Sequence, residues 1–519
     1  MGKAKKAAKS AAIIIIFSLI SKFLGFLREV LIASNFGSGM ETDAYFVALS
    51  ATTVLMGMVA AGLNTTLIPI FAEIEVKNGH DKKIDYMNNL INVVNILAAF
   101  FVILGWFLSP IIIRIMAKGF EGEQFQLAVN LTRIGLPIML FTGTRAIFTG
   151  YLQSNESFLA PAAIGLPFNA VYILYLIFLS HKFGIKGLMV ASVLAVLVQI
   201  FIQIPAVKNQ GYRYRFKVDF KDKYIKKALL LTLPVMVGTA INELNMIVDK
   251  TMASSLQEGS ISSLSYASKL NGIILGVFIA AITTVIFPML SKESNKDNMN
   301  GVKLIMSHGI NIILLITLPA TVGLIILSEP IVRLFFQRGA FDATATAMTT
   351  KALIFYAVGL VGMALRLMLN KVYYSMQDTK TPMINSAIAV GANIGLNFLF
   401  IKPLGHGGLA LATSISTTIA TILLIRDLDK RVDDIDHSTN RKCMAKTLVA
   451  SIIMGVVVYF LYGGLNRVFI GGKMIELLIL IVSVAIGAMV YIGLCYLFRV
   501  EEIRMVIDRM KLRLGKSMA

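Results

Sequence analysis

Long apolar stretches follow one another along almost the whole chain, and they constrain its fold more than any other feature. A transmembrane helix needs about 20 apolar residues, so stretches of this length predict membrane-spanning helices. Only 15% of the residues are charged, against about a quarter in soluble domains, which excludes most classes of soluble enzyme. The expected fold is an all-α polytopic membrane protein with fourteen spans, at residues 11–35, 43–72, 87–113, 125–152, 158–180, 185–206, 228–254, 261–291, 303–328, 343–374, 382–402, 406–426, 444–464 and 474–498.

Basic residues are in excess and are concentrated between the predicted spans. The chain carries 49 Lys and Arg against 29 Asp and Glu, and cytoplasmic loops of polytopic proteins are enriched in such bases. Lysines precede the first span, eight bases lie in the 207–227 segment, and further bases follow the last span. We therefore expect both termini and the 207–227 linker on the cytoplasmic side of the membrane, and no nucleic-acid partner.

The final segment, 499–519, combines these bases with apolar residues at helical spacing. An amphipathic helix lying in the membrane interface is the expected structure, and a solvated tail is the alternative. The apolar positions of this helix are Ile503, Val506, Ile507, Met510 and Leu514.

Short sequence similarities indicate an internal repeat with an offset of about 220 residues. Residues 29–34 (EVLIAS) match 249–254 (DKTMAS), and the Gln153 and Asn169 pair matches the pair formed by Gln377 and Asn393. We expect two six-span lobes of the same orientation, related by a pseudo-twofold axis along the membrane normal, as in an alternating-access transporter. Similar composition of hydrophobic helices is the alternative explanation. The corresponding divisions are 1–206, a linker at 207–227, 228–426, a second cytoplasmic linker at 427–443, two additional spans in 444–498, and the 499–519 tail.

Three charged residues, Lys22, Arg28 and Glu29, lie inside the first predicted span. A charge near the bilayer centre costs about 2.5 to 3.5 kcal/mol on insertion scales, so such side chains are expected to face a cavity. Glu29 neutralises one base and leaves a net positive charge. Snorkelling of Lys22 or Arg28 to the interface is the alternative.

Other predicted spans also carry charged residues, again of both signs. A surplus of bases in a desolvated cavity suits a phosphate or diphosphate, which accepts several charge-assisted hydrogen bonds. Asp249 near Asn393 or Asn397 is a candidate site for a monovalent cation, Na⁺ or H⁺, although polar contacts between helices explain such Asn residues equally well. Asp43 has the alternative role of a helix cap. The charged residues in question are Asp43, Glu243, Asp249, Lys269, Arg366 and Lys371.

No pattern for bond-breaking chemistry is present in the sequence. There is no phosphate-binding GxxxxGK[ST] loop, and no His or Cys pairing for nucleophilic catalysis or metal binding. We therefore expect a transporter without a cofactor, driven by an ion gradient or by the gradient of its own substrate, and not an enzyme.

Four segments closely resemble the MurJ (MviN) lipid II flippases of the MOP exporter superfamily. They are residues 21–46 (SKFLGFLREVLIASNFGSGMETDAYF), 67–73 (LIPIFAE), 265–270 (SYASKL) and 373–382 (YYSMQDTKTP). The resemblance implies a fourteen-helix bundle of two six-helix lobes, with spans thirteen and fourteen forming a membrane-facing groove for a polyprenyl chain. The implied cargo is undecaprenyl-diphosphate-linked muropeptide, the peptidoglycan precursor lipid II, moved to the outer leaflet of the bacterial cytoplasmic membrane by a monomer embedded among membrane lipids.

The resemblance also suggests roles for particular residues. Arg28 stands at the family's cavity arginine, Lys22 and Lys269 stand where members more often have arginine, and Asp43 is the acid of the TDA.F motif. The sequence departs from the family at 55–62 (LMGMVAAG), where many members have two arginines and a glutamate. The substrate-binding candidates are thus Lys22, Arg28, Glu29, Asp43, Lys269 and Arg366, and the ion-coupling candidates are Asp249 and Asn393.

Two other functions remain open at this point. A flippase for another undecaprenyl-diphosphate-linked glycan would need the same features. A cation-coupled exporter of small molecules from the same superfamily is disfavoured, because the first span carries two bases against one acid, whereas a cavity for cationic drugs should be rich in acids.

Overall fold

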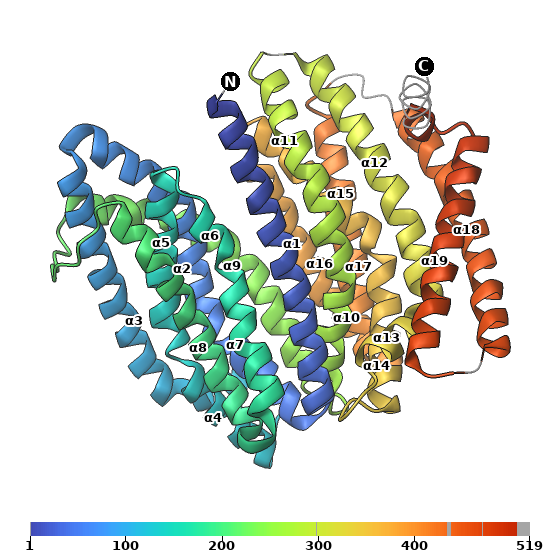
Figure 1. Ribbon diagram of the computed structural model, residues 1–519, viewed down its shortest axis with the longest axis horizontal. Coiled ribbons are helices and arrows are strands. Elements are labelled where there is room, and N and C mark those ends of the chain that lie inside the picture. The colour runs from blue at the N-terminus through green and yellow to red at the C-terminus, as the bar shows by residue number, and fades with distance from the viewer. Residues whose placement is uncertain (1, 297, 433–436, 470, 506–519) are drawn as a thin grey trace. The chain divides into compact units, whose positions relative to one another are not determined.

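The computed structural model describes residues 2–296, 298–432, 437–469 and 471–505, and only the backbone path of residues 2–12. This described part of the chain is helical nearly throughout and contains no β-strand (Figure 1). The expected all-α membrane fold is confirmed. The helices are α1 (Gly2–Phe36), α2 (Met40–Asn78), α3 (His80–Met116), α4 (Gly122–Gly135), α5 (Ile138–Ser154), α6 (Leu159–Ala163), α7 (Gly165–Phe178), α8 (Ser180–Asn209), α9 (Lys223–Ala253), α10 (Ser260–Ile274), the π-helix η1 (Leu275–Ile279), α11 (Ala280–Ser294), α12 (Met299–Ile326), α13 (Ser328–Phe336), α14 (Ala343–Val358), α15 (Leu360–Ser375), α16 (Lys380–Leu404), α17 (His406–Asp429), α18 (His437–Val468) and α19 (Lys473–Leu497).

Twelve helical segments of the described chain are long and apolar enough to cross a membrane. A thirteenth forms if α14 and α15, which meet at an angle of 48°, count as one span. The remaining expected span coincides with α1, whose apolar part carries the three charges. Every expected span therefore overlaps one helix or consecutive helices, and the number fourteen stays a prediction.

Several expected spans are broken in their middle, mostly at Gly or Pro. α5 begins directly after Pro137, whose ring cannot continue the hydrogen-bond ladder of α4. α14 and α15 are separated at Gly359, where a Cβ would lie 2.6 Å from Cα of Ser414, so only glycine permits this approach of α17. The short helix α13 lies in an expected loop and was not predicted, because nine residues are too few to span a membrane.

The first compact unit comprises Met1–Ser262 together with Arg338–Asp342. Its central helix α2 packs against α3, α4, α5 and α9. Gly62 allows the approach of α9, since a Cβ there would lie 2.3 Å from Cγ2 of Thr232. We expected α9 to open the second lobe, yet it packs in unit 1. The helix packing thus places a boundary after α9, whereas the sequence repeat places it before α9. The lobes 1–206 and 228–426 stay a prediction.

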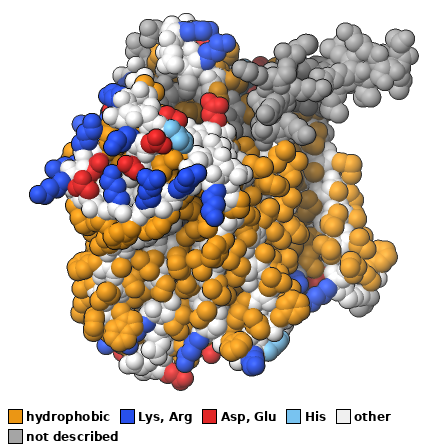
Figure 2. All heavy atoms as spheres, turned by 60° about the vertical axis from the view of Figure 1, so that its left-hand side comes forward, with side chains coloured by type: hydrophobic (Ala, Val, Ile, Leu, Met, Phe, Trp, Pro, Cys, Tyr) orange, Lys and Arg blue, Asp and Glu red, His pale blue; other side chains and the backbone are white. Residues whose placement is uncertain are grey.

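The linker at 207–227 lies on the side of α3 and is held there by asparagines. The Nδ2 atoms of Asn88, Asn89 and Asn92 donate to main-chain carbonyls of the linker at 2.9 to 3.0 Å. Figure 2 shows Lys and Arg side chains gathered along one edge of a broad hydrophobic surface. The exposed linker bases are Lys208, Arg213, Arg215, Lys221, Lys223, Lys226 and Lys227.

The second compact unit comprises Ser263–Gln337 and Ala343–Ala519. In it α16 pairs with α17, and α12 packs against α18, which in turn packs against α19. The expected amphipathic tail begins after Arg499, and its positions from 506 to 519 lie outside the described residues, as do residues 433–436 of the second linker.

In each unit a bent span ends in a turn of the same kind, which also occurs after α8, at Gly211, and after α19, at Arg499. Glu156 follows α5 and Gln377 follows α15, and both adopt positive φ angles, of 57° and 59°. In both turns the residue after the positive-φ position donates its N–H to a carbonyl five residues earlier, to Leu152 in one turn and Tyr373 in the other. The turns at Glu156 and Gln377 lie 221 residues apart, and the internal repeat stays a prediction.

Candidate functional site

Arg28 lies at the centre of a cluster in unit 1 that joins α1 and α7. Its Nη2 donates to Oε1 of Glu29 at 2.7 Å, and its Nη1 donates to Oδ1 of Asn169 at 3.2 Å. The guanidinium also lies over the rings of Phe168 and Tyr172, 5.3 and 4.9 Å from their centroids. These contacts fix the guanidinium, and 17% of the side chain stays exposed. We call Arg28, Glu29, Asn169, Phe168 and Tyr172 the Arg28 cluster.

Glu29 is the buried counter-ion of this cluster. Its side chain is only 6% exposed, and its Oε2 is buried without a hydrogen-bond partner among the described residues. Lys22, on the same helix, is exposed. Glu29 therefore pairs with Arg28, one of the two bases in the first span. The formal charge of Lys22, Arg28 and Glu29 together is +1.

Asp43 joins two segments of unit 1 that are far apart in sequence. Its Oδ1 accepts from the N–H and the hydroxyl of Ser262, both at 2.7 Å, and its Oδ2 accepts from the N–H of Gly259 at 2.8 Å. The carboxylate is almost fully buried. These contacts hold the start of α2 against the loop before α10, so they favour a structural role over substrate binding.

The ion-coupling candidates lie in different units. In unit 1, Nδ2 of Asn245 donates to Oδ2 of Asp249 at 3.4 Å along α9. In unit 2, Oδ1 of Asn393 accepts from Asn397 at 3.0 Å, and Nδ2 of Asn393 donates to the hydroxyl of Thr413 at 3.3 Å. The hydrogen bond of Asp249 thus lies within its own helix, whereas Asn393 contacts α17, as the alternative of polar contacts between helices expects. The described residues contain no cluster of three or more His, Cys, Asp or Glu side chains that fits a metal ion.

Two bases of unit 2 complete the predicted set. Lys269 is exposed on α10. Arg366 on α15 donates from Nη2 to the hydroxyl of Ser386 on α16 at 2.8 Å. Both side chains therefore lie on helices that make up the predicted second lobe.

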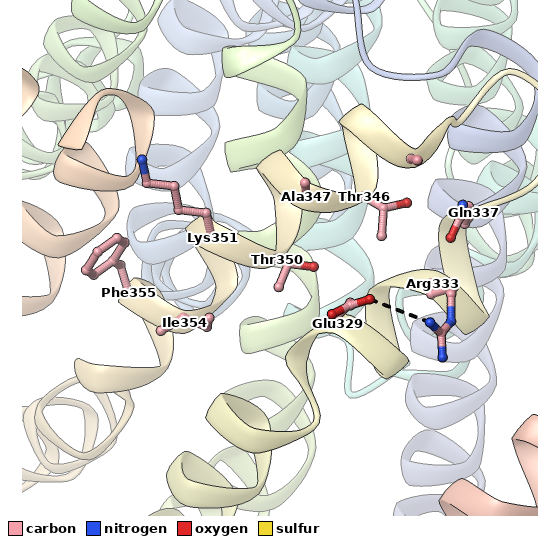
Figure 3. Close-up of a pocket in the computed structure, with 10 residues that line it drawn as sticks. Glu329, Arg333, Gln337, Thr346, Ala347, Thr350, Lys351, Ile354 and Phe355 are labelled. Atoms are coloured by element: carbon pink, nitrogen blue, oxygen red, sulfur yellow. Dashed lines mark ion pairs between the residues drawn. The ribbon is translucent and has the colours of Figure 1, made fainter. Parts of the chain in front are cut away.

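A cavity of about 630 Å³ in unit 2 contains none of these predicted residues. It lies along α13 and α14, with Arg333 and Lys351 at opposite ends of its wall (Figure 3). Arg333 is already bonded to Glu329 at 3.5 Å and to Glu476 at 2.7 Å, the latter across to α19. Its charge therefore serves to hold α13 against α19.

The sequence analysis missed two features that the structure shows. In the QDTKTP motif, Asp378 forms an ion pair with Arg431 at 2.6 Å. It also accepts hydrogen bonds from the N–H groups of Lys380 and Thr381. Arg145, in the middle of α5, was not singled out, although it is visible in the sequence as one of two arginines in span 125–152, the other being Arg133.

Comparison with known proteins yields a consistent set of relatives. The sequence model of the family described as lipid II flippase MurJ matches residues 32–480. A relative from Vibrio cholerae, described as a "probable lipid II flippase MurJ", is 30% identical over 464 residues, which cover 87% of this chain and 88% of the relative. The lipid II flippase MurJ of Burkholderia cenocepacia is 28% identical, with 80% of this chain and 82% of the relative covered.

Solved structures agree with these sequence matches. A structure of lipid II flippase MurJ in an inward closed conformation superimposes with a TM-score of 0.78 at 27% identity, covering 94% of this chain and 99% of that one. An inward-facing multidrug resistance transporter of the MATE family, in the MOP superfamily, gives a TM-score of 0.70 at 15% identity, covering 83% and 99%. The second match shows a shared fold alone.

Proposed function

The chain belongs to the MurJ family of lipid II flippases, and from this premise we propose that the Arg28 cluster binds the diphosphate of lipid II. The chain is a membrane transporter and not an enzyme, and lipid II is its cargo. The flippase and exporter alternatives considered from the sequence are thereby set aside. The proposal adds the residues that hold the cargo and the way in which transport is driven.

The fixed geometry of Arg28 is the observation that carries the proposal. A guanidinium held by two hydrogen bonds and two rings loses little further freedom when it binds an anion, and it offers several donors to a diphosphate. Lys22 supplies the charge that Glu29 does not neutralise. Lys269 and Arg366 are the bases that we propose for the second lobe.

The hydrogen bonds of Asp43 lead us to propose a structural role for this residue in place of substrate binding. Its carboxylate oxygens already accept three hydrogen bonds from protein donors, which leaves little capacity for a substrate donor. We propose that Asp43 holds α2 and the loop before α10 together.

The apolar tail of lipid II needs a surface of its own. α18 and α19 expose many large apolar side chains, among them Ile452, Val456, Tyr459, Phe460, Ile481 and Val484. This exposure supports the groove for the polyprenyl chain that the family resemblance implies, although membrane lipids cover such surfaces equally well.

We propose that the chain lies in the bacterial cytoplasmic membrane as a monomer, with both termini and the linker at 207–227 on the cytoplasmic side. A cysteine introduced at Asn209 should therefore resist an impermeant thiol reagent in intact cells, and one at Glu258 should react. The native Cys443 and Cys495 are both buried and should give little background. The reverse labelling pattern would contradict the proposed sidedness.

Coupling to a monovalent cation is the remaining part of the proposal. Two carboxylates of unit 1 are candidates, Asp249 beside Asn245 and Glu29 with its unbonded Oε2. A proton or Na⁺ there would offset the cost of a carboxylate in the membrane, and it drives transport only if it binds one conformation better than the other. Asn393 is the corresponding candidate in unit 2.

Lipid II transport in vesicles reconstituted with the full chain should respond to Na⁺ or pH if Asp249 couples transport to a cation. In the Asp249→Asn variant this response should disappear while some transport persists, because the neutral amide mimics the ion-bound state. Asn245→Ala serves as the matched control for the hydrogen bond alone and should keep the response. An equal response in wild type and Asp249→Asn would remove Asp249 from the mechanism.

A further inference from the structure

Arg145 lies inside a membrane span, and its charged side chain has no partner in the described chain. It lies in α5, part of the candidate span Gly122–Ser154. Its side chain makes no hydrogen bond, ion pair or ring contact with any described residue. Arg28 differs, since Glu29 and Asn169 bind it. Arg133 of α4 also differs, since it donates to the hydroxyl of Ser109 at 3.0 Å and lies 4.5 Å from the ring centroid of Trp106.

An unpaired guanidinium in this position is costly. Charged side chains within spans normally face a cavity and pair with one another or with a ligand. Arg145 is partly buried, yet its nitrogen atoms are not among the fully enclosed unbonded polar atoms of the described chain. The guanidinium is therefore not fully enclosed by the described chain.

The face of α5 that carries Arg145 is polar over more than one turn. Thr149 lies one turn further along this face, and its hydroxyl donates to Oε1 of Gln203 on α8 at 3.1 Å. Gln199, one turn before Gln203 on α8, is also buried. Arg145 thus lies on the polar side of α5 that turns toward α8, inside unit 1.

The internal repeat gives Arg145 a counterpart. It precedes the positive-φ residue Glu156 by eleven positions, and Arg366 precedes the positive-φ residue Gln377 by the same number. Both arginines therefore occupy equivalent places in spans that end in the same turn. Arg366 is one of the bases proposed for the cargo, and it has a hydrogen bond to Ser386, whereas Arg145 has none.

We propose that Arg145 binds the diphosphate of lipid II in unit 1, as the counterpart of Arg366 in unit 2. This inference rests on the proposed function and adds a binding residue to it. In the unliganded protein the unpaired guanidinium raises the free energy of the folded state. When the anion binds, the guanidinium becomes paired, so the removal of this cost favours the bound state.

The test compares three variants of the full chain purified in detergent. Affinity is measured for two probes, lipid II and a bare polyprenyl diphosphate, and thermal stability is measured without ligand. Arg145→Met should weaken binding of both probes roughly tenfold to a hundredfold and should leave the melting temperature equal or higher, because a costly charge is removed. Arg145→Lys should recover much of the affinity.

Arg133→Met is the matched control, since it replaces a bonded arginine of the same span. It should lower the melting temperature and leave affinity for both probes unchanged. The inference is overturned if Arg145→Met behaves like Arg133→Met, or if it weakens binding of lipid II but not of the bare diphosphate, which would place a carboxylate of the cargo there instead. If wild type binds neither probe, the proposed function itself fails.

Discussion

Replacing Arg28 by alanine should abolish lipid II transport in vesicles. The substitution removes the proposed diphosphate donor, and it also leaves Glu29 buried without its counter-ion. Removing one partner of a buried ion pair typically costs about 3 to 5 kcal/mol. The single variant should therefore be inactive and less stable, and its inactivity alone would not separate the two causes.

A double variant separates loss of function from loss of stability. Arg28→Ala combined with Glu29→Ala removes both charges, so it should melt close to wild type and still fail to transport. Arg28→Lys keeps the charge and loses the forked geometry, so it should transport slowly. Normal transport by the double variant at normal expression would show that Arg28 does not hold the cargo.

Replacing Asp43 by alanine should unfold or strongly destabilise the protein. The change leaves the N–H groups of Gly259 and Ser262 without acceptors in a buried place, while the hydroxyl of Ser262 keeps the carbonyl of Gly259 as an acceptor at 3.2 Å. Each buried unsatisfied donor costs about 1 to 3 kcal/mol, so the total should reach several kcal/mol. Thermal unfolding in detergent, followed by loss of monodisperse protein, measures the effect.

Ser262→Ala is the graded control for Asp43. It removes one of the three hydrogen bonds and should lower the melting temperature by a smaller amount, with lipid II affinity unchanged. An Asp43→Ala protein that melts like wild type and no longer binds lipid II would restore the substrate-binding role expected from the sequence.

The spans were predictable because hydropathy alone determines them. The breaks within the spans were harder to predict. Pro137 and Gly359 mark two bends, and the π-helix η1 contains Gly276, but many other glycines of the spans lie in regular helix. The packing of α9 in unit 1 depends on a close contact between Gly62 and Thr232, and no local pattern reveals a contact between residues so far apart in sequence.

The site was predictable in its residues and less so in its contacts. The three charges of the first span were evident in the sequence, and so was the net positive charge, but which of the two bases Glu29 pairs with was not. In the structure the long guanidinium reaches Glu29 beside it, and its other partner, Asn169, lies 141 residues away. Pairing of long side chains depends on such distant neighbours, which a helical wheel does not contain.

Arg145 was overlooked for a related reason. Matching Gln153 with Gln377 gives a repeat offset of 224, at which Arg145 and Arg366 do not align. The backbone turns at Glu156 and Gln377 give the offset of 221. The correspondence that we propose between Arg145 and Arg366 therefore depends on backbone conformation, which residue identities do not contain.

Rescue of a bacterium depleted of its own lipid II flippase tests the central claim most directly. Cells that express this chain should resume growth and expose lipid II on the outer face of the membrane, as measured with an impermeant reagent. Cells that express the double variant Arg28→Ala and Glu29→Ala at the same level should do neither. Failure of the wild-type chain to expose lipid II, despite correct insertion, would contradict the account.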